Sequence, residues 1–151
     1  MSHPFEIGGL GEIAIRCRDL DAMFIFYRDV LGLPVLSDTR ATSGIVFFRL
    51  GNGVAGHTSV LALFDHAAGR ANVHATSTRP PETGAQSSLH HVALSLTRAE
   101  QDKAIAHYRS IGQEFQIQVF DWIGWRGVFT NDPDGNTVEL VAFDPEFRAD
   151  Q

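Results

Sequence analysis

Two short segments of the chain, residues 12–17 and 91–96, show the same alternation of apolar and polar residues. Every second residue in each segment is apolar, which is typical of a β-strand with one buried face. The apolar positions are Ile13, Ile15 and Cys17 in the first segment and Val92, Leu94 and Leu96 in the second. In both cases apolar residues at helical spacing follow the strand. Residues 11–33 and 90–112 therefore read as two copies of one strand–helix unit.

A capping residue marks the start of each predicted helix. Asp19 is expected to cap a helix over residues 19–31, which ends before Gly32. In the second copy Thr97 and Glu100 fit a capping box. Three strand-like runs follow each helix, so each half of the chain has the order β-α-β-β-β. The runs are residues 34–40, 44–50 and 58–64 in the first half and 115–121, 125–130 and 136–143 in the second.

The two halves predict the organisation of the chain: a first βαβββ module over residues 9–64 and a second over residues 89–144. Residues 65–88 between them are rich in Ala, Ser, Thr, Gly and Pro and have no hydrophobic period, so they are predicted to form a crossover loop. Neither half can bury both faces of its own sheet. We therefore expect an α+β fold in which two tandem modules form one structural domain, a curved eight-stranded cup with the helices outside.

Composition narrows the classes of function. The chain has 151 residues, 44% of them hydrophobic, and this length supports a core without disulfides or a structural metal. A net charge of −6 and the lack of a Lys or Arg run argue against a nucleic-acid partner. No apolar stretch approaches the roughly 20 residues of a membrane span, and the N-terminal sequence lacks the features of a signal peptide. Together with the single cysteine, Cys17, these features predict a cytoplasmic protein with no membrane partner.

Alternation along the strands also predicts which side chains point into the cup. Because the strictly apolar positions face the helices, Glu12 on the first strand and His91 on the fifth face inward at equivalent positions. Glu139 on the last strand and Ala62 on the fourth are equivalent as well. Two carboxylates and an imidazole on a mostly apolar surface are costly unless something neutralises them. A divalent cation (Mn, Fe, Co, Ni or Zn) held by Glu12, His91 and Glu139 is the simplest candidate.

The chain resembles the vicinal oxygen chelate superfamily, which includes glyoxalases, bleomycin resistance proteins and extradiol dioxygenases. The resemblance spans about residues 9–144 and is carried by GEIAIRCRDLDAMFIFYRDVLGL, the strand HHVALSL and the segment WRGVFTNDPDGNTVELV. The last segment is the most specific, because the family ends in a DPDGN-x-x-E-L run whose Glu binds metal. By this resemblance Glu139, His91 and Glu12 stand where the family places its metal ligands.

Two positions depart from the family's pattern. Glu12 replaces the His, or in some glyoxalases the Gln, of the first strand, and Ala62 replaces the fourth-strand Glu of glyoxalase I. The resemblance implies a metal-dependent lyase, isomerase or dioxygenase whose substrate chelates through two neighbouring oxygens, with Glu139 or Glu12 as a base. One alternative is a metal-free protein of the bleomycin-resistance type that sequesters a small molecule, with a histidine–carboxylate hydrogen bond in place of the metal. For Glu12 alone, the alternative is a salt bridge to Arg16 or Arg126.

Four further residues are candidates for substrate binding. Phe64 and Trp125 are expected to shape an apolar pocket, Ser95 shares the inward parity, and Arg126 is a candidate clamp for a substrate anion. The predicted helix over residues 19–31 also carries apolar side chains outside its main stripe. Such a surface, together with the dimers common in the family, predicts a homodimer.

Overall fold

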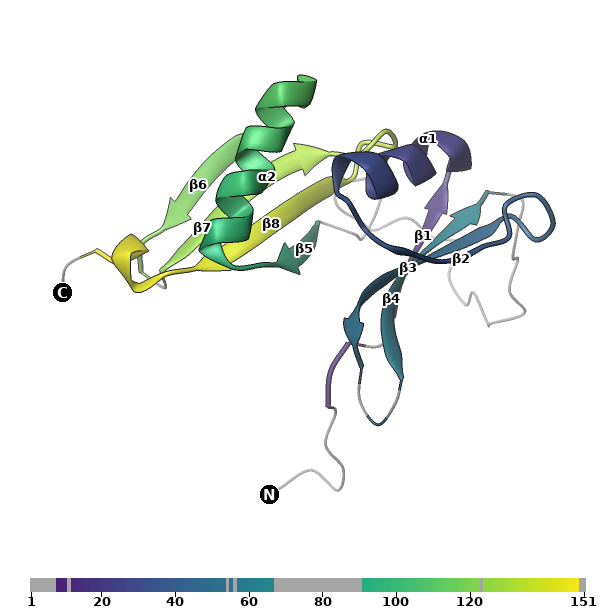
Figure 1. The fold of residues 1–151 in the computed structure, drawn as a ribbon, viewed down its shortest axis with the longest axis horizontal. Helices are drawn as coiled ribbons and strands as arrows, with labels where there is room; N and C mark the ends of the chain where they lie inside the picture. The colour runs from purple at the N-terminus through teal and green to yellow at the C-terminus, as the bar shows by residue number, and fades with distance from the viewer. Residues whose placement is uncertain are drawn as a thin grey trace, which may run out of the picture. The chain divides into compact units, whose positions relative to one another are not determined.

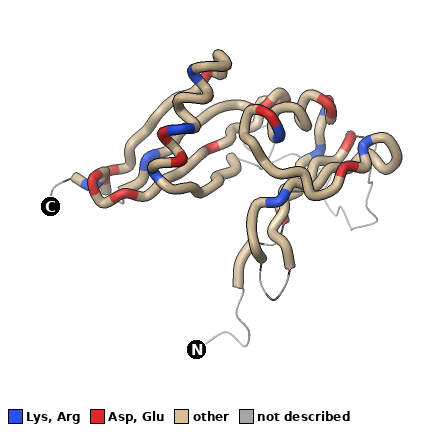
Figure 2. Tube along the Cα trace, viewed as in Figure 1, with Lys and Arg blue, Asp and Glu red and all other residues tan. Residues whose placement is uncertain are grey.

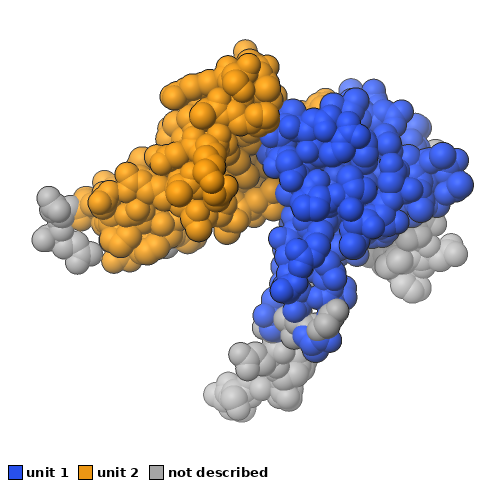
Figure 3. Space-filling model, in the orientation of Figure 1, with its two compact units in different colours: residues 1–74 blue, residues 75–151 orange. Residues whose placement is uncertain are grey.

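The computed structural model describes residues 8–10, 12–53, 55, 57–66, 91–122 and 124–149. The chain divides into two compact units, unit 1 (residues 1–74) and unit 2 (residues 75–151), shown in Figure 3. The described part of unit 1 contains β1 (Glu12–Cys17), α1 (Leu20–Ile25), a π-helix (Phe26–Val30), β2 (Val35–Asp38), β3 (Ile45–Asn52) and β4 (Thr58–Asp65). The described part of unit 2 contains β5 (Val92–Ser95), α2 (Arg98–Ile111), β6 (Gln116–Phe120), β7 (Trp125–Asn131), β8 (Thr137–Phe143) and a 3₁₀ helix (Pro145–Phe147).

Each unit is built around one four-stranded sheet (Figure 1). The strand orders are β1-β4-β3-β2 and β5-β8-β7-β6, so the second sheet repeats the first. The first and last strands of each module pair in parallel and the remaining pairs are antiparallel. The α+β class and the two βαβββ modules are therefore confirmed. The closure of both sheets into one cup stays a prediction, and the predicted crossover loop falls largely outside the described residues.

The register of the parallel pairs confirms which positions correspond in the two modules. Ala14 is paired with Ala62 in unit 1, and Ala93 is paired with Glu139 in unit 2. Two residues before Ala14 and Ala93 stand Glu12 and His91. The position of Glu12 relative to Ala62 in unit 1 is therefore the same as the position of His91 relative to Glu139 in unit 2.

One face of each sheet packs on its own helix. In unit 2 the buried β8 residues Val138, Leu140 and Ala142 lie on this face, and the Gln101 side chain of α2 donates a hydrogen bond of 2.7 Å to the Leu140 carbonyl. In unit 1 the ring of Phe48 lies 5.8 Å from that of Phe24 and 6.2 Å from that of Tyr27. The opposite face, called the far face below, carries the alternate residues of each strand.

The predicted caps are confirmed, but the first helix differs from the prediction. The Asp19 side chain accepts from the Ala22 amide at 2.9 Å, and the Thr97 hydroxyl accepts from the Glu100 amide at 3.3 Å. The segment predicted as one helix over residues 19–31 is instead α1 followed by the π-helix, whose i+5 bond joins the Leu31 amide to the Phe26 carbonyl at 3.1 Å.

The π-helix is explained by a difference in length between the two copies of the repeat. Tyr-Arg is followed by a helix-ending glycine in both modules, but residues 27–32 form a segment one residue longer than residues 108–112. A π-turn absorbs one extra residue without ending the helix. Gly32 and Gly112 then end their helices in the same left-handed conformation, with φ of 72° and 71°.

The DPDG turn sets the register of the strand that carries Glu139. Asp132 accepts hydrogen bonds from the amides of Asp134 and Asn136 at 3.0 and 2.9 Å, and Gly135 has φ of 84°. This turn connects β7 to β8 and pairs Phe129 with Glu139. Among the described helices, none has the length and apolar character needed to cross a membrane.

Candidate metal centre

A histidine and a carboxylate lie together on the far face of the unit-2 sheet. Glu139 is in the middle of β8, and His91 immediately precedes β5. The parallel register pairs Ala93 with Glu139, so His91, two residues earlier on the same face, reaches the Glu139 side chain. The Nε2 atom of His91 is 3.4 Å from the Oε2 atom of Glu139. The fold thus brings together two of the three predicted metal ligands.

Glu139 is the more buried of the two residues. Its side chain is 8% exposed, against 35% for His91. Burial raises the pKa of the Glu139 carboxyl above its usual value, and the charge of His91 lowers it in part. A carboxylate removed from water is costly unless a cation or hydrogen-bond donors take the place of water. His91 supplies one partner, and a metal ion is a second group of the right charge.

Gly127 makes room for this carboxylate. A Cβ atom at Gly127 would stand 2.5 Å from Oε1 of Glu139 and 2.6 Å from Cε2 of Phe129, closer than carbon tolerates. The Phe129 ring in turn lies edge-on to the His91 ring, with centroids 6.5 Å apart. The missing side chain at Gly127 is therefore what allows Glu139 and Phe129 to share this part of the far face.

The donor set fits a transition metal. Imidazole nitrogen and carboxylate oxygen bind Mn, Fe, Co, Ni and Zn, and catalytic sites usually have about three protein ligands. Over the described ranges, no three His, Cys, Asp or Glu side chains are grouped closely enough to hold a metal ion. The third predicted ligand, Glu12, is exposed on β1 in unit 1, and its approach to the His91–Glu139 pair stays a prediction.

The corresponding positions in unit 1 are filled with apolar side chains. Ala62 is fully buried at the position of Glu139. Its cross-strand partner Phe47 stacks edge-on with Phe64, with ring centroids 6.4 Å apart. Ile45, the partner of Phe64, stands where unit 2 has Gly127. This sheet has no carboxylate at the Glu139 position and no space left for one.

Arg126 lies on the helix-facing side of its sheet, opposite to Glu139. Its guanidinium forms an ion pair with Asp102 of α2, and its Nε atom donates to Oε1 of Gln101 at 2.5 Å. Phe147 packs against the same guanidinium at 5.0 Å. Figure 2 shows acidic and basic residues interspersed along this helix. The arrangement fixes α2 on the sheet, and the role of Arg126 as a substrate-anion clamp stays a prediction.

The other predicted substrate residues are on far faces. Trp125 is 42% exposed and pairs across the strands with Phe143. Ser95 is exposed at the end of β5 and pairs with Val141, one position along the face from Glu139. Phe64 is in unit 1, half-buried against Phe47. Trp125 and Ser95 thus share the sheet face of the His91–Glu139 pair.

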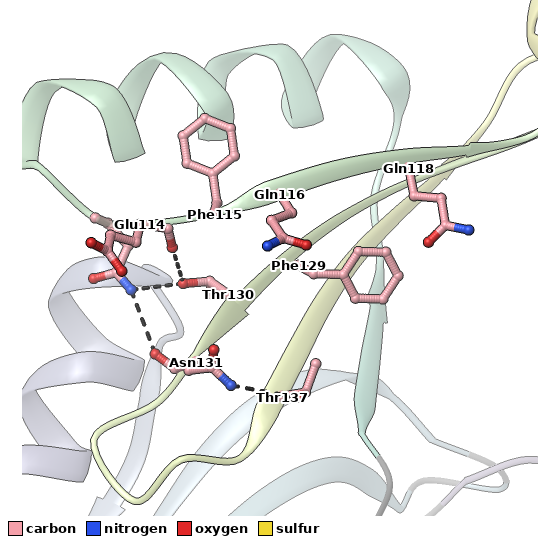
Figure 4. A pocket seen from close by; sticks show the side chains of 9 residues that line it. Glu114, Phe115, Gln116, Gln118, Phe129, Thr130, Asn131 and Thr137 are labelled. Carbon is pink, nitrogen blue, oxygen red and sulfur yellow. Dashed lines mark hydrogen bonds between the residues drawn. The ribbon is translucent and has the colours of Figure 1, made fainter.

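A polar groove beside this pair was not predicted from the sequence. A cleft of about 740 Å³ runs along β6 and β7 and reaches the start of β8. Figure 4 shows Gln116 and Gln118 of β6 with the Phe129 ring between them. The sequence signal was the alternation Gln-Ile-Gln-Val, which places both glutamines on one face of a strand.

Comparison with known proteins agrees with this architecture. The family model described as the Glyoxalase/Bleomycin resistance protein/Dioxygenase superfamily matches residues 9–140. The chain belongs to this superfamily. No curated protein sequence matches the chain.

Solved structures of superfamily proteins are similar over nearly the whole chain. A lactoylglutathione lyase from Agrobacterium tumefaciens is 26% identical, with a TM-score of 0.65 over 90% of this chain and 94% of that one. A glyoxalase/bleomycin resistance protein/dioxygenase from Nocardioides is also 26% identical, with a TM-score of 0.59 over 100% and 91%. A fosfomycin resistance protein from Listeria monocytogenes, 18% identical with a TM-score of 0.61 over 97% and 100%, shares the fold.

Proposed function

We propose that this superfamily member is a metal-dependent enzyme that acts on a small molecule chelating the metal through two neighbouring oxygens, in a lyase, isomerase or dioxygenase reaction. The observation that supports it is the 3.4 Å contact between His91 Nε2 and Glu139 Oε2 on the far face of unit 2. The similarity to a lactoylglutathione lyase supports an enzymatic role over a purely structural one.

His91 and Glu139 are the proposed protein ligands, with Glu12 as the third. When bound, a divalent ion of Mn, Fe, Co, Ni or Zn supplies Lewis-acid stabilisation of negative charge on the substrate oxygens. Glu139 or Glu12 is the proposed base.

The surroundings of the pair suit a small organic substrate. Trp125 and Ser95 on the same sheet face, with Phe64 from unit 1, are proposed to contact it. We also propose that the protein is cytoplasmic and forms a homodimer. Ile25 of α1, 51% exposed, supports a subunit contact.

Calorimetric titration of metal-stripped protein with Mn²⁺, Co²⁺, Ni²⁺ and Zn²⁺ tests this proposal. Wild type is expected to bind one ion per chain. His91→Ala and Glu139→Gln are expected to weaken binding by at least about 100-fold, because each removes a ligand. If Glu12 is the third ligand, Glu12→Gln weakens binding as well.

His57→Ala and His66→Ala are the matched controls, because both histidines are exposed in unit 1 and neither is a proposed ligand. They are expected to bind metal like wild type. A wild-type protein that takes up none of these ions contradicts the proposal and favours metal-free sequestration of a ligand. Unchanged binding in Glu12→Gln removes Glu12 from the ligand set and leaves the pair.

A further inference from the structure

The groove on unit 2 shares a wall with the His91–Glu139 pair. Phe129 lines the groove, is the cross-strand partner of Glu139, and lies 6.5 Å from His91 between ring centroids. Thr137 lines the groove as well, at the start of the strand that carries Glu139. The groove therefore adjoins the pair through Phe129. The volume of about 740 Å³ is within the range of small-molecule sites.

Hydrogen bonds between lining residues hold one end of the groove in place. The Gln113 amide donates to Thr130 Oγ1 at 2.7 Å, and the Thr130 hydroxyl donates to the Glu114 carbonyl at 2.7 Å. Asn131 donates to Thr137 Oγ1 at 3.5 Å, and Figure 4 draws these bonds as dashed lines. These side chains fix the shape of the groove and are engaged with one another.

Gln116 and Gln118 are different. Register places Gln116 opposite Phe129 and Gln118 opposite Gly127, on the far face. Among the described residues neither side-chain amide has a hydrogen-bond partner. In Figure 4 both side chains extend from β6 on either side of the Phe129 ring. Each amide offers donors and an acceptor without charge.

The charge of the groove limits what it binds. Its described lining contains one ionisable side chain, Glu114, and no lysine or arginine. An anionic group has no cation to pair with there and meets a carboxylate. A flat apolar group has Phe129, and a neutral polar group has the two glutamine amides.

We propose that this groove binds the part of the substrate that does not touch the metal, and that this part is uncharged and carries an amide or hydroxyl group hydrogen-bonded by Gln116 and Gln118. The proposal rests on the proposed function, because it takes the His91–Glu139 pair as the point where the substrate is anchored.

Hydroxamates test it, because their two neighbouring oxygens chelate a metal. Acetohydroxamate has no substituent long enough to enter the groove, so its binding reports on the metal alone. Three longer hydroxamates of equal length, ending in a primary amide, a carboxylate or an ammonium group, report on the groove. With Co²⁺-loaded protein, the amide-ended probe is expected to bind about tenfold more tightly than the carboxylate-ended one.

The double variant Gln116→Leu/Gln118→Leu is expected to lose this preference and to bind acetohydroxamate as wild type does. Ile117→Leu/Val119→Leu is the matched control, because these residues are on the same strand, face the other way and are 45% and 48% exposed. It is expected to keep the preference. Equal affinity for the amide and carboxylate probes, tightest binding of the ammonium probe, or a preference that survives the glutamine changes would overturn the proposal.

A failure of the metal site is distinguishable from a failure of the groove. If acetohydroxamate does not bind the Co²⁺-treated protein, the proposed function fails. The groove is then tested in metal-free protein by the side-chain NH₂ resonances of Gln116 and Gln118. Shifts on adding the amide-ended probe at millimolar concentration support the groove, and unmoved resonances refute it.

Discussion

Units 1 and 2 have the same strand order and the same parallel register, yet the equivalent positions on their far faces differ in chemistry. Unit 2 has Glu139 beside His91, with Gly127 leaving space for the carboxylate. Unit 1 has Ala62 at the position of Glu139 and Ile45 at the position of Gly127. The backbone alone therefore does not make the proposed metal site. It needs a carboxylate, an imidazole and the space that a neighbouring glycine provides.

The largest effect is expected from placing a carboxylate in unit 1. Ala62→Glu puts a charge at a fully buried position beside Phe47 and Phe64, with no histidine next to it. We expect unfolding free energy to fall by about 3 kcal/mol or more, measured by urea denaturation. Ala62→Leu, which adds similar bulk without charge, separates the cost of charge from that of size. A stable Ala62→Glu protein that binds a second metal ion would show that the units are chemically interchangeable.

Filling the space in unit 2 is expected to have the next largest effect. Gly127→Ala brings a methyl group against the Glu139 carboxylate and the Phe129 ring. We expect a loss of about 1–3 kcal/mol in stability, together with weaker metal binding measured by calorimetry. Ile45→Val, at the same position in unit 1, is the control and is expected to leave metal binding unchanged. If Gly127→Ala leaves metal affinity unchanged, the space at Gly127 is not needed for metal binding.

A smaller difference in stability is expected between variants of two buried tyrosines, one in each unit. Tyr108 of α2 is 1% exposed, and its hydroxyl is the buried side-chain polar atom in the described part of the chain that has no hydrogen-bond partner. Burial also raises its pKa to about 12. Tyr27 of unit 1 is fully buried as well, but its hydroxyl is not among the buried polar atoms that lack a hydrogen-bond partner. Tyr108→Phe is expected to be neutral or stabilising and Tyr27→Phe to cost about 1 kcal/mol, measured by thermal or urea unfolding. Equal losses in both variants would contradict the difference.

The smallest effect is expected from pH, because His91 partly opposes the shift at Glu139. Burial favours the protonated carboxyl in the folded state, so the folded protein holds this proton to higher pH than the unfolded chain does. The resulting stability is present below the unfolded pKa of the glutamate and is lost as pH rises through the folded pKa. Metal-free Glu139→Gln is expected to lack this dependence when urea unfolding is followed from acidic to neutral pH. A curve that coincides with wild type would contradict the assigned cause.

The repeat made the pairing of equivalent positions predictable from sequence. The alternation in the first and last strands of both halves was sufficient to match Glu12 with His91 and Ala62 with Glu139, and the two registers confirm this match. Successive side chains of a β-strand point to opposite faces. The alternation of apolar and polar residues in the sequence therefore shows which residues share a face.

Three features were not predicted, for different physical reasons. The π-helix was missed because hydrophobic spacing does not distinguish i+4 from i+5 bonding, although the extra residue before Gly32 was visible. The helix-facing position of Arg126 was not predicted, although Arg126 shares the parity of the buried Val128. The groove depends on how side chains from three strands are placed relative to one another, which no single strand pattern contains.

Anomalous X-ray diffraction from crystals of the Co²⁺-loaded protein decides whether His91 and Glu139 hold a metal, because it locates the ion rather than counting it. We expect one strong peak per chain within bonding distance of His91 Nε2 and Glu139 Oε2, and none beside Ala62. A peak bound by other residues, or His91 and Glu139 still in direct contact with no metal at full Co²⁺ saturation, would contradict it.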